Sequence, residues 1–208
     1  MHAAAIEHLR VRDQRLKAWI DRIGPIKLPP RRSRDPYRAL LESVVYQQLH
    51  GSAARTIWNR LLDQFEDREP TPERVLATAD DRLRGAGLSR NKATAIRAIA
   101  HSAAAGEIPD ARRIVKLTDE EIRERLTRIR GIGPWTVDML LIFTLRKPDI
   151  MPLNDYGVRK GFKAAYRKKL LPTGRQLLEF AERWRPYRTT AALYLWRIAD
   201  RAEDDATS

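Results

Sequence analysis

Apolar residues recur along the chain at the three- and four-residue spacing of an α-helix. The stripe from Tyr37 to Val45 follows the spacing i, i+3, i+4, i+7, i+8, which is typical of one buried helix face. Asp35 and Pro36 stand directly before it as an N-cap and a first-turn residue. The pattern therefore predicts a helix over about 36–49.

The rest of the chain repeats this helical pattern. A second stripe runs from Ala53 to Phe65, and Thr118 with Glu121 three residues later forms a capping box that opens a helix ending near Arg130. The other predicted helices run from a cap at Ser89 or Asn91 to Ala105, and over 134–146, 155–169, 174–184 and 188–201. No segment alternates apolar and polar residues as a strand does, and no Asn-Gly or Asp-Gly dipeptide occurs. We predict an all-α fold of ten or so helices without a solenoid repeat.

Composition fits a soluble globular protein. The chain has 208 residues, of which 43% are hydrophobic, and these occur in short runs such as Met139–Phe143 rather than in a membrane span. The segment Met1–His8 already contains a charged residue and lacks the apolar core of a secretory signal. We therefore expect a cytoplasmic protein.

The cysteine and histidine content excludes several kinds of chemistry. With no cysteine, the chain has no disulfide, thiolate nucleophile, cysteine-based zinc site or iron–sulfur cluster. The four histidines are His2, His8, His50 and His101, and no two have the i, i+4 spacing of a helical zinc pair. We expect chemistry that requires no cofactor.

The charge favours a polyanionic partner. The formal net charge is +13, and residues 123–169 hold 12 Lys or Arg against four acids. A solvated basic face would show the same excess, so charge alone leaves nucleic-acid binding as one of two interpretations.

A Gly-x-Gly turn lies between two predicted helices. The stretch Leu126–Thr136 reads LTRIRGIGPWT, and its glycines permit a tight turn that leaves backbone N–H groups facing outward at the start of the next helix. Such a turn can bind a backbone phosphate without reading sequence. An ordinary interhelical turn is the alternative.

A second motif lies about twenty residues later. Residues 152–161 read PLNDYGVRKG and place the single acid Asp155 at the start of a basic helix. Together the two motifs resemble the helix-hairpin-helix (HhH-GPD) DNA glycosylase superfamily, over roughly residues 35–200. The GIGPWT and PLNDYG runs most resemble its 3-methyladenine DNA glycosylase II branch.

The resemblance implies that Asp155 is the catalytic carboxylate. An ionised carboxylate beside the sugar stabilises an oxocarbenium-like transition state and orients water on the anomeric carbon. From the residues alone, Asp155 is equally an N-cap of the 155–169 helix. The two roles are compatible, since a helix N-terminus favours negative charge.

Trp135 determines whether the DNA strand is cut after the base is released. Bifunctional relatives carry at this position a lysine that forms a Schiff base with the sugar. An indole forms no imine, so we expect an intact abasic site and no strand cleavage. The four-cysteine iron–sulfur loop of other branches is also missing.

The resemblance assigns a base pocket to Trp135, Trp196 and Met139. An indole face attracts a cationic alkylated purine by roughly 0.5–2 kcal/mol. Met139 stands one turn beyond Trp135 and faces the same way. A core position is the alternative for either tryptophan.

The junction at residues 46–52 lies against the DNA minor groove in the family. Leu49 matches an intercalating wedge, with Gln48 beside it. Leu49 could equally belong to the core stripe.

The same resemblance implies further DNA and ion contacts. Phosphate contacts fall on the backbone of Gly131 and Gly133 and on Arg159 and Lys160. Relatives also hold a monovalent cation, Na⁺ or K⁺, through hairpin carbonyls that correspond here to Thr127, Ile129 and Ile132.

In the family fold, we expect residues 37–150 to form a central helical lobe, with the hairpin at about 120–146. Residues 1–36 and 151–208 would form a second lobe that carries the catalytic Asp, with the cleft between the lobes. The implied function is a monofunctional alkylpurine DNA glycosylase of base excision repair that acts as a monomer on damaged duplex DNA of the nucleoid. The alternatives are a glycosylase for deaminated or etheno bases, and a catalytically silent DNA-binding module.

Overall fold

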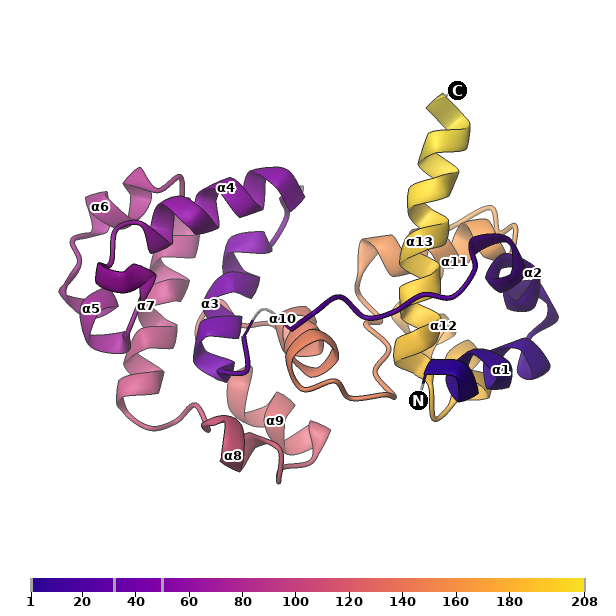
Figure 1. The fold of residues 1–208 in the computed structure, drawn as a ribbon, viewed down its shortest axis with the longest axis horizontal. Helices are drawn as coiled ribbons and strands as arrows, with labels where there is room; N and C mark the ends of the chain where they lie inside the picture. The colour runs from indigo at the N-terminus through magenta and orange to yellow at the C-terminus, as the bar shows by residue number, and fades with distance from the viewer. Residues whose placement is uncertain (1, 32, 50, 208) are drawn as a thin grey trace. The chain divides into compact units, whose positions relative to one another are not determined.

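The computed structural model describes residues 2–31, 33–49 and 51–207. Every regular element within these residues is a helix, so the all-α prediction is confirmed (Figure 1). No helix among them has the length and apolar content needed to cross a membrane. The chain divides into two compact units. Unit 1 comprises the residues up to Pro30 and those from Arg146 onward, and unit 2 comprises Arg31–Leu145.

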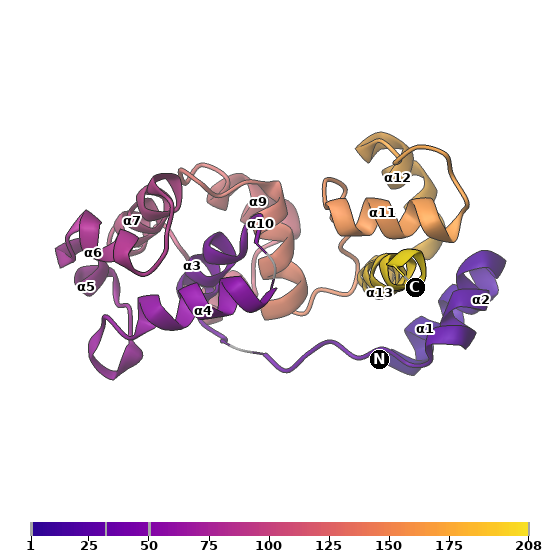
Figure 2. The same ribbon diagram turned by 90° about the horizontal axis from the view of Figure 1, so that it is seen from above.

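Unit 1 contains the two ends of the chain. Its elements are α1 (His2–Arg12), α2 (Gln14–Ile23), α11 (Tyr156–Ala165), α12 (Gly174–Ala181), the 3₁₀ turn η3 (Glu182–Trp184) and α13 (Arg188–Thr207). Helices α11 and α13 pack along one another, as Figures 1 and 2 both show. Their buried contacts include Val158 and Phe162 on α11 and Leu195 and Ile198 on α13.

A buried carboxylate ties the N-terminal helices of unit 1 to its C-terminal part. Asp13 caps α2 by accepting a hydrogen bond from the Leu16 N–H at 3.0 Å. Its other oxygen accepts from the Tyr166 hydroxyl at 2.7 Å and from the Trp184 indole N–H at 3.1 Å. Burial, with Asp13 adding to it, raises the pKa of the Tyr166 hydroxyl far above its usual value, so this group stays a donor.

Unit 2 carries the Gly-x-Gly turn. Its elements are α3 (Pro36–Tyr46), α4 (Gly51–Leu62), the 3₁₀ turn η1 (Glu66–Arg68), α5 (Pro72–Ala77), α6 (Asp80–Gly85), α7 (Arg90–Ala104), α8 (Ala111–Ile114), α9 (Asp119–Leu126), α10 (Pro134–Met139) and the π-helical turn η2 (Leu140–Thr144). Helix α3 packs against α4, α7 and α10 (Figure 1). The apolar stripe Leu40, Leu41, Val44 and Val45 is fully buried there.

The predicted helix starts are confirmed by their caps. Asp35 accepts from two N–H groups at the start of α3, and Ser89 rather than Asn91 caps α7. Both hydrogen bonds of the Thr118–Glu121 capping box are present at the start of α9. A side-chain cap is a local interaction, which is why the sequence could predict it.

Several predicted helix ends are wrong. Helix α3 ends at Tyr46 rather than at 49, because the backbone leaves helical angles at Gln47 and turns left-handed at Gln48, with φ 56°. Helix α11 ends at Ala165 rather than at 169, because Arg167 is left-handed. The 134–146 segment starts as α10 but widens into a π-helical turn.

Candidate active site and nucleic-acid interface

Asp155 is held at the N-terminus of α11 by two donors on one carboxylate oxygen. Its Oδ1 accepts from the Val158 N–H at 2.7 Å, which confirms that Asp155 is the N-cap. The same Oδ1 accepts from the Trp196 indole N–H on α13 at 2.8 Å. The residue keeps only 9% of its surface exposed. The carboxylate is therefore oriented by two elements of unit 1.

Glycines on α11 create the space for the Trp196 indole. A Cβ at Gly157 would lie 2.8 Å from Cδ1 and 3.2 Å from Nε1 of Trp196. One turn on, a Cβ at Gly161 would lie 1.8 Å from the Leu195 carbonyl oxygen. Any larger residue would force α13 away, and the indole would move away from Asp155. Both glycines stand in the sequence motif, but no sequence pattern indicated this role for them.

Trp196 is half-buried and packs against the apolar core of unit 1. Its N–H edge points at Asp155, a contact that no sequence pattern indicated. That its ring lines a base pocket stays a prediction.

The hairpin joins α9 to α10 and uses its two glycines differently. Gly131 has φ 88°, and a Cβ there would lie 2.3 Å from the Ala95 Cβ on α7, so the fold itself requires glycine. Gly133 is the N-cap of α10 in an extended conformation, and a Cβ there would meet no other part of the protein within 4 Å beyond its own neighbours in the chain. The fold does not require glycine at 133, which leaves the approach to this turn open.

An ion pair links the two hairpin helices. Arg123 on α9 binds the carboxylate of Asp138 on α10, and Asp138 is buried. This pair holds the helices that flank the turn, and no motif in the sequence indicated it.

The 46–49 junction presents two exposed side chains. Gln48 is exposed, and Leu49 keeps 38% of its surface exposed. The alternative interpretation of Leu49 as a core residue is therefore wrong. That Leu49 acts as a wedge stays a prediction, and His50 lies outside the described residues.

Within unit 2, Gln47 attaches this junction to the hairpin, and Lys92 attaches it to α7. The Gln47 amide donates to the Gly131 carbonyl at 3.1 Å and to the Thr136 hydroxyl at 2.9 Å. The Lys92 ammonium donates to the Val45 and Gln47 carbonyls at 2.7 and 2.8 Å. Burial lowers the Lys92 pKa below its usual 10.5. Nothing in the sequence pattern marked Lys92 for this role.

Trp135 and Met139 lie one turn apart on α10, and both are half-buried. Thr136, Val137 and Asp138, which lie between them in sequence, are buried. The two predicted pocket residues thus leave part of their surface to solvent while their neighbours hold the helix in place.

The two predicted basic contacts on α11 differ in their surroundings. The Arg159 Nε donates to the Pro172 carbonyl at 2.7 Å, so one guanidinium nitrogen is used inside unit 1. Lys160, the next residue on α11, is partly exposed. Phosphate binding by either side chain stays a prediction.

The carbonyl groups of Thr127, Ile129 and Ile132 are suitable ligands for a monovalent cation, because all three are neutral oxygen ligands. The Ile129 carbonyl accepts from the Ile132 N–H at 3.0 Å, and a carbonyl has a second lone pair. Thr127 comes directly after the last residue of α9, where helix carbonyls lack partners within the helix. The cation itself stays a prediction.

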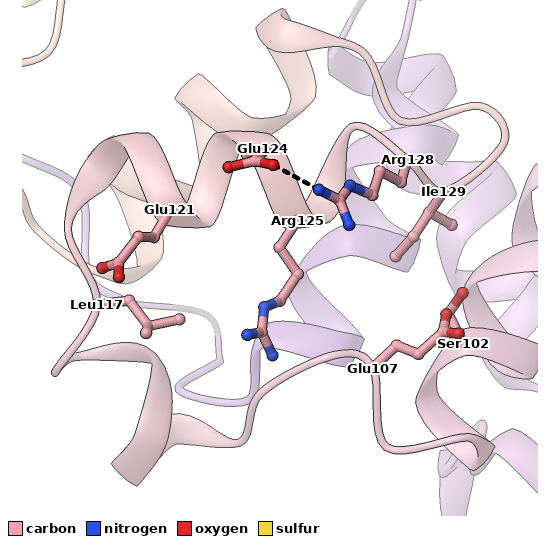
Figure 3. Close-up of a pocket in the computed structure, with 8 residues that line it drawn as sticks. All are labelled: Ser102, Glu107, Leu117, Glu121, Glu124, Arg125, Arg128 and Ile129. Atoms are coloured by element: carbon pink, nitrogen blue, oxygen red, sulfur yellow. Dashed lines mark hydrogen bonds and ion pairs between the residues drawn. The ribbon is translucent and has the colours of Figure 1, made fainter.

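A pocket of about 500 Å³ lies beside α9 (Figure 3). Its wall carries charges of both signs and includes the Glu124–Arg128 ion pair. Of the predicted site residues, only Ile129 lines it. This pocket is therefore separate from the predicted base-binding residues. Over the described part of the chain, no three His, Asp or Glu side chains are grouped to hold a metal ion.

Comparison with known proteins assigns the chain to a family. Residues 41–186 match the HhH-GPD superfamily of base excision DNA repair proteins. DNA-3-methyladenine glycosylase 1 of Schizosaccharomyces pombe is 37% identical over 200 residues, which cover 94% of this chain and 87% of that protein.

Two solved structures share the fold. The S. pombe 3-methyladenine DNA glycosylase in complex with abasic DNA aligns with a TM-score of 0.89 at 37% identity, covering 93% of this chain and 95% of that one. A DNA-3-methyladenine glycosidase from Bacillus halodurans aligns with a TM-score of 0.78 at 31% identity, covering 94% and 88%. The motifs, the fold and these likenesses agree: the chain belongs to the HhH-GPD superfamily of base excision DNA repair proteins.

Proposed function

We propose that this protein is a monofunctional DNA glycosylase that hydrolyses the N-glycosidic bond of alkylated purines such as 3-methyladenine and 7-methylguanine. The observation that carries the proposal is the Asp155 carboxylate, oriented by Val158 and Trp196 at the start of α11. The relatives named as DNA-3-methyladenine glycosylases support the substrate class. The protein acts as a monomer on damaged duplex DNA. It is cytoplasmic and associates with the nucleoid through DNA binding.

Asp155 supplies the charge that the reaction needs. As the bond between the sugar and the base breaks, the base leaves with the bonding electron pair and positive charge develops on the sugar. The carboxylate stabilises that charge and orients a water molecule, whose oxygen bonds to the anomeric carbon. The water proton passes to solvent, and an abasic site remains.

The chemical nature of the leaving base determines how much the enzyme must stabilise the transition state. A purine alkylated at N3 or N7 is cationic, so it leaves as a neutral molecule and its glycosidic bond is already labile. The Trp135 ring attracts such a cation by roughly 0.5–2 kcal/mol, and Met139 adds a polarisable surface one turn away. Trp196 contributes to the same pocket beside Asp155, to which its indole N–H donates.

DNA is held without reading its sequence. Backbone N–H groups at Gly131 and Gly133 bind a phosphate, and the open space at Gly133 supports this role. Arg159 and Lys160 add cationic contacts. A monovalent cation held by the carbonyls of Thr127, Ile129 and Ile132 would supply positive charge at the same turn.

The exposed junction fills the gap that a flipped base leaves. Leu49 is the apolar wedge and Gln48 the polar neighbour, and the exposure of both side chains supports this assignment. The reaction ends at the abasic site, since Trp135 cannot form an imine with the sugar.

The test is base release from methylated duplex DNA, measured chromatographically. The wild type should release 3-methyladenine or 7-methylguanine without strand breaks in the absence of alkali. Asp155→Asn should abolish release and retain duplex binding. An unchanged rate in that variant would remove Asp155 from the mechanism.

A parallel assay separates the alternative lesions. Duplexes with a deaminated or an etheno base should release base more slowly than methylated DNA does. Faster release from them would replace the alkylpurine assignment, and binding without any release would indicate a silent DNA-binding module.

A further inference from the structure

Basic residues lie on the solvent-facing side of α11 and just beyond its C-terminus. Val158, Phe162 and Ala165 are buried, which places Lys160 and Lys163 on the opposite face, and Arg167 follows two residues after the end of the helix. Lys163 and Arg167 are exposed, and Lys160 is partly exposed. We call these three residues the basic ridge. It begins one turn after the Asp155 cap.

No acid interrupts this charge along the chain, because no Asp or Glu occurs between Tyr156 and Leu178. The acids that flank this stretch are Asp155 and Glu179. Asp155 accepts hydrogen bonds from Val158 and Trp196, and Glu179 pairs with Arg175. Of the ridge residues, Lys163 and Arg167 form no ion pair with any described residue.

The helix dipole explains only part of the ridge. Cations near a helix C-terminus are stabilising, which accounts for Arg167 in sign. Lys160 is the fifth residue of α11 and lies beyond its first turn, so the dipole effect does not bear on it.

Arg167 occupies a position at which glycine is preferred. The Lys168 N–H donates to the Lys163 carbonyl at 2.9 Å and the Arg167 N–H to the Ala164 carbonyl at 3.3 Å, a pattern that requires a left-handed residue at Arg167, with φ 50°.

Helix α7 ends with the same two hydrogen bonds, from Glu107 and Gly106, but there the left-handed residue is Gly106, with φ 72°. An arginine in this conformation costs stability that glycine would not.

Other left-handed arginines have a use inside the protein. Arg68 binds Asp63 and Asn59, and Arg146 donates to the Pro29 carbonyl. For Arg167, the structure gives the guanidinium no hydrogen bond or ion pair with any described residue. A strained cation without an internal partner points to an external anion.

We propose that Lys163 and Arg167 bind backbone phosphates of duplex DNA, extending the contacts of Lys160 away from Asp155. The inference rests on the proposed function. Lys160 and Arg167 are seven residues apart, about 10 Å along the helix direction, which matches the rise of roughly three phosphates along one strand. Lysine and arginine bind phosphate without base recognition, so the ridge adds affinity that is independent of sequence.

The experiment measures binding to a short undamaged duplex by fluorescence anisotropy between about 50 and about 200 mM salt. The slope of log K against log salt is negative, and Arg167→Gly and Lys163→Ala should each reduce its magnitude by about 0.9. Arg167→Lys should retain the wild-type slope. Arg167→Gly should also unfold at a temperature equal to or above that of the wild type, because glycine relieves the left-handed position. A loss of binding in this variant would then not come from misfolding.

Lys27→Ala is the matched control, since Lys27 is an exposed cation of unit 1 outside the ridge and its removal should leave the slope unchanged. Wild-type slopes in both Arg167→Gly and Lys163→Ala would overturn the inference, as would an equal fall in Lys27→Ala. Base release by the wild type is measured separately. Release with unchanged slopes would refute the ridge alone, whereas lowered slopes without release would refute the proposed reaction and keep the ridge.

Discussion

Trp196 donates its indole N–H to the carboxylate of Asp155 at 2.8 Å, across the contact between α13 and α11. The same pairing occurs elsewhere in unit 1, where Trp184 donates to Asp13 at 3.1 Å. Both aspartates also cap a helix. Asp13 also accepts a hydrogen bond from the Tyr166 hydroxyl. Asp155 is the carboxylate that we propose as catalytic, so the same interaction can be compared in a structural and in a proposed catalytic setting.

Trp196→Phe should slow base release by roughly 10- to 150-fold, because it removes a hydrogen bond to a charged group and keeps the aromatic ring. Binding to undamaged duplex should change little. Single-turnover release from methylated DNA measures the first effect and anisotropy the second. Trp184→Phe is the control: it should lower the free energy of unfolding by about 1–3 kcal/mol and spare the release rate. A wild-type release rate in Trp196→Phe would show that the bond does not orient Asp155.

The two hairpin glycines should respond in opposite ways to substitution. Gly131→Ala should destabilise the protein by roughly 1–3 kcal/mol, since its Cβ meets Ala95 and its φ is 88°. Ala95→Gly in the same chain should restore part of that loss. Gly133→Ser should keep the unfolding midpoint, because serine is a good N-cap and no atom crowds the site, yet it should weaken duplex binding. Equal binding by Gly133→Ser and the wild type would remove this turn from the interface.

Leu49→Ala should reduce base release by about tenfold or more, because the gap left by the flipped base would no longer be filled. Its free energy of unfolding should stay within about 0.5 kcal/mol of the wild type, as expected for an exposed side chain. Leu178→Ala is a close match, with 40% of Leu178 exposed against 38% of Leu49. If both variants release base at the wild-type rate, Leu49 is not the wedge.

The sequence predicted those features of the fold that depend on neighbouring residues. Asp35, Ser89 and Thr118 cap helices through side chains that bond within three residues, and the apolar stripe of α3 is buried. The ends of helices were harder to predict, because they depend on the backbone conformation of single residues. The left-handed turns at Gln48 and Arg167 occur at residues that ordinarily avoid that conformation.

The candidate site divides in the same way. The residues that a motif names, such as Asp155, could be proposed as candidates from the sequence. The partners that hold them could not: Trp196 is 41 residues from Asp155, and Lys92 is 45 residues from Gln47. Such contacts come from packing between helices, which a single sequence does not encode as a local pattern.

The capping box of α9 makes part of the stability of the hairpin dependent on pH. The hydrogen bond from the Thr118 N–H, together with the Thr118 side chain, lowers the Glu121 pKa below its ordinary 4.5. Because the folded pKa lies below the unfolded one, the unfolded chain binds more protons in that range. The stabilising contribution is therefore complete above the unfolded pKa and is lost as pH falls through the folded one.

Glu121→Gln keeps an acceptor oxygen and removes the charge. It should unfold at a lower urea concentration than the wild type at pH 7, and the difference should shrink as the pH falls through the folded pKa of Glu121. Glu120→Gln, an exposed residue in the same first turn, removes the same charge outside the box and should show a smaller difference at pH 7. A gap between Glu121→Gln and the wild type that persists unchanged at low pH would assign the effect to side-chain geometry rather than to the ionised carboxylate.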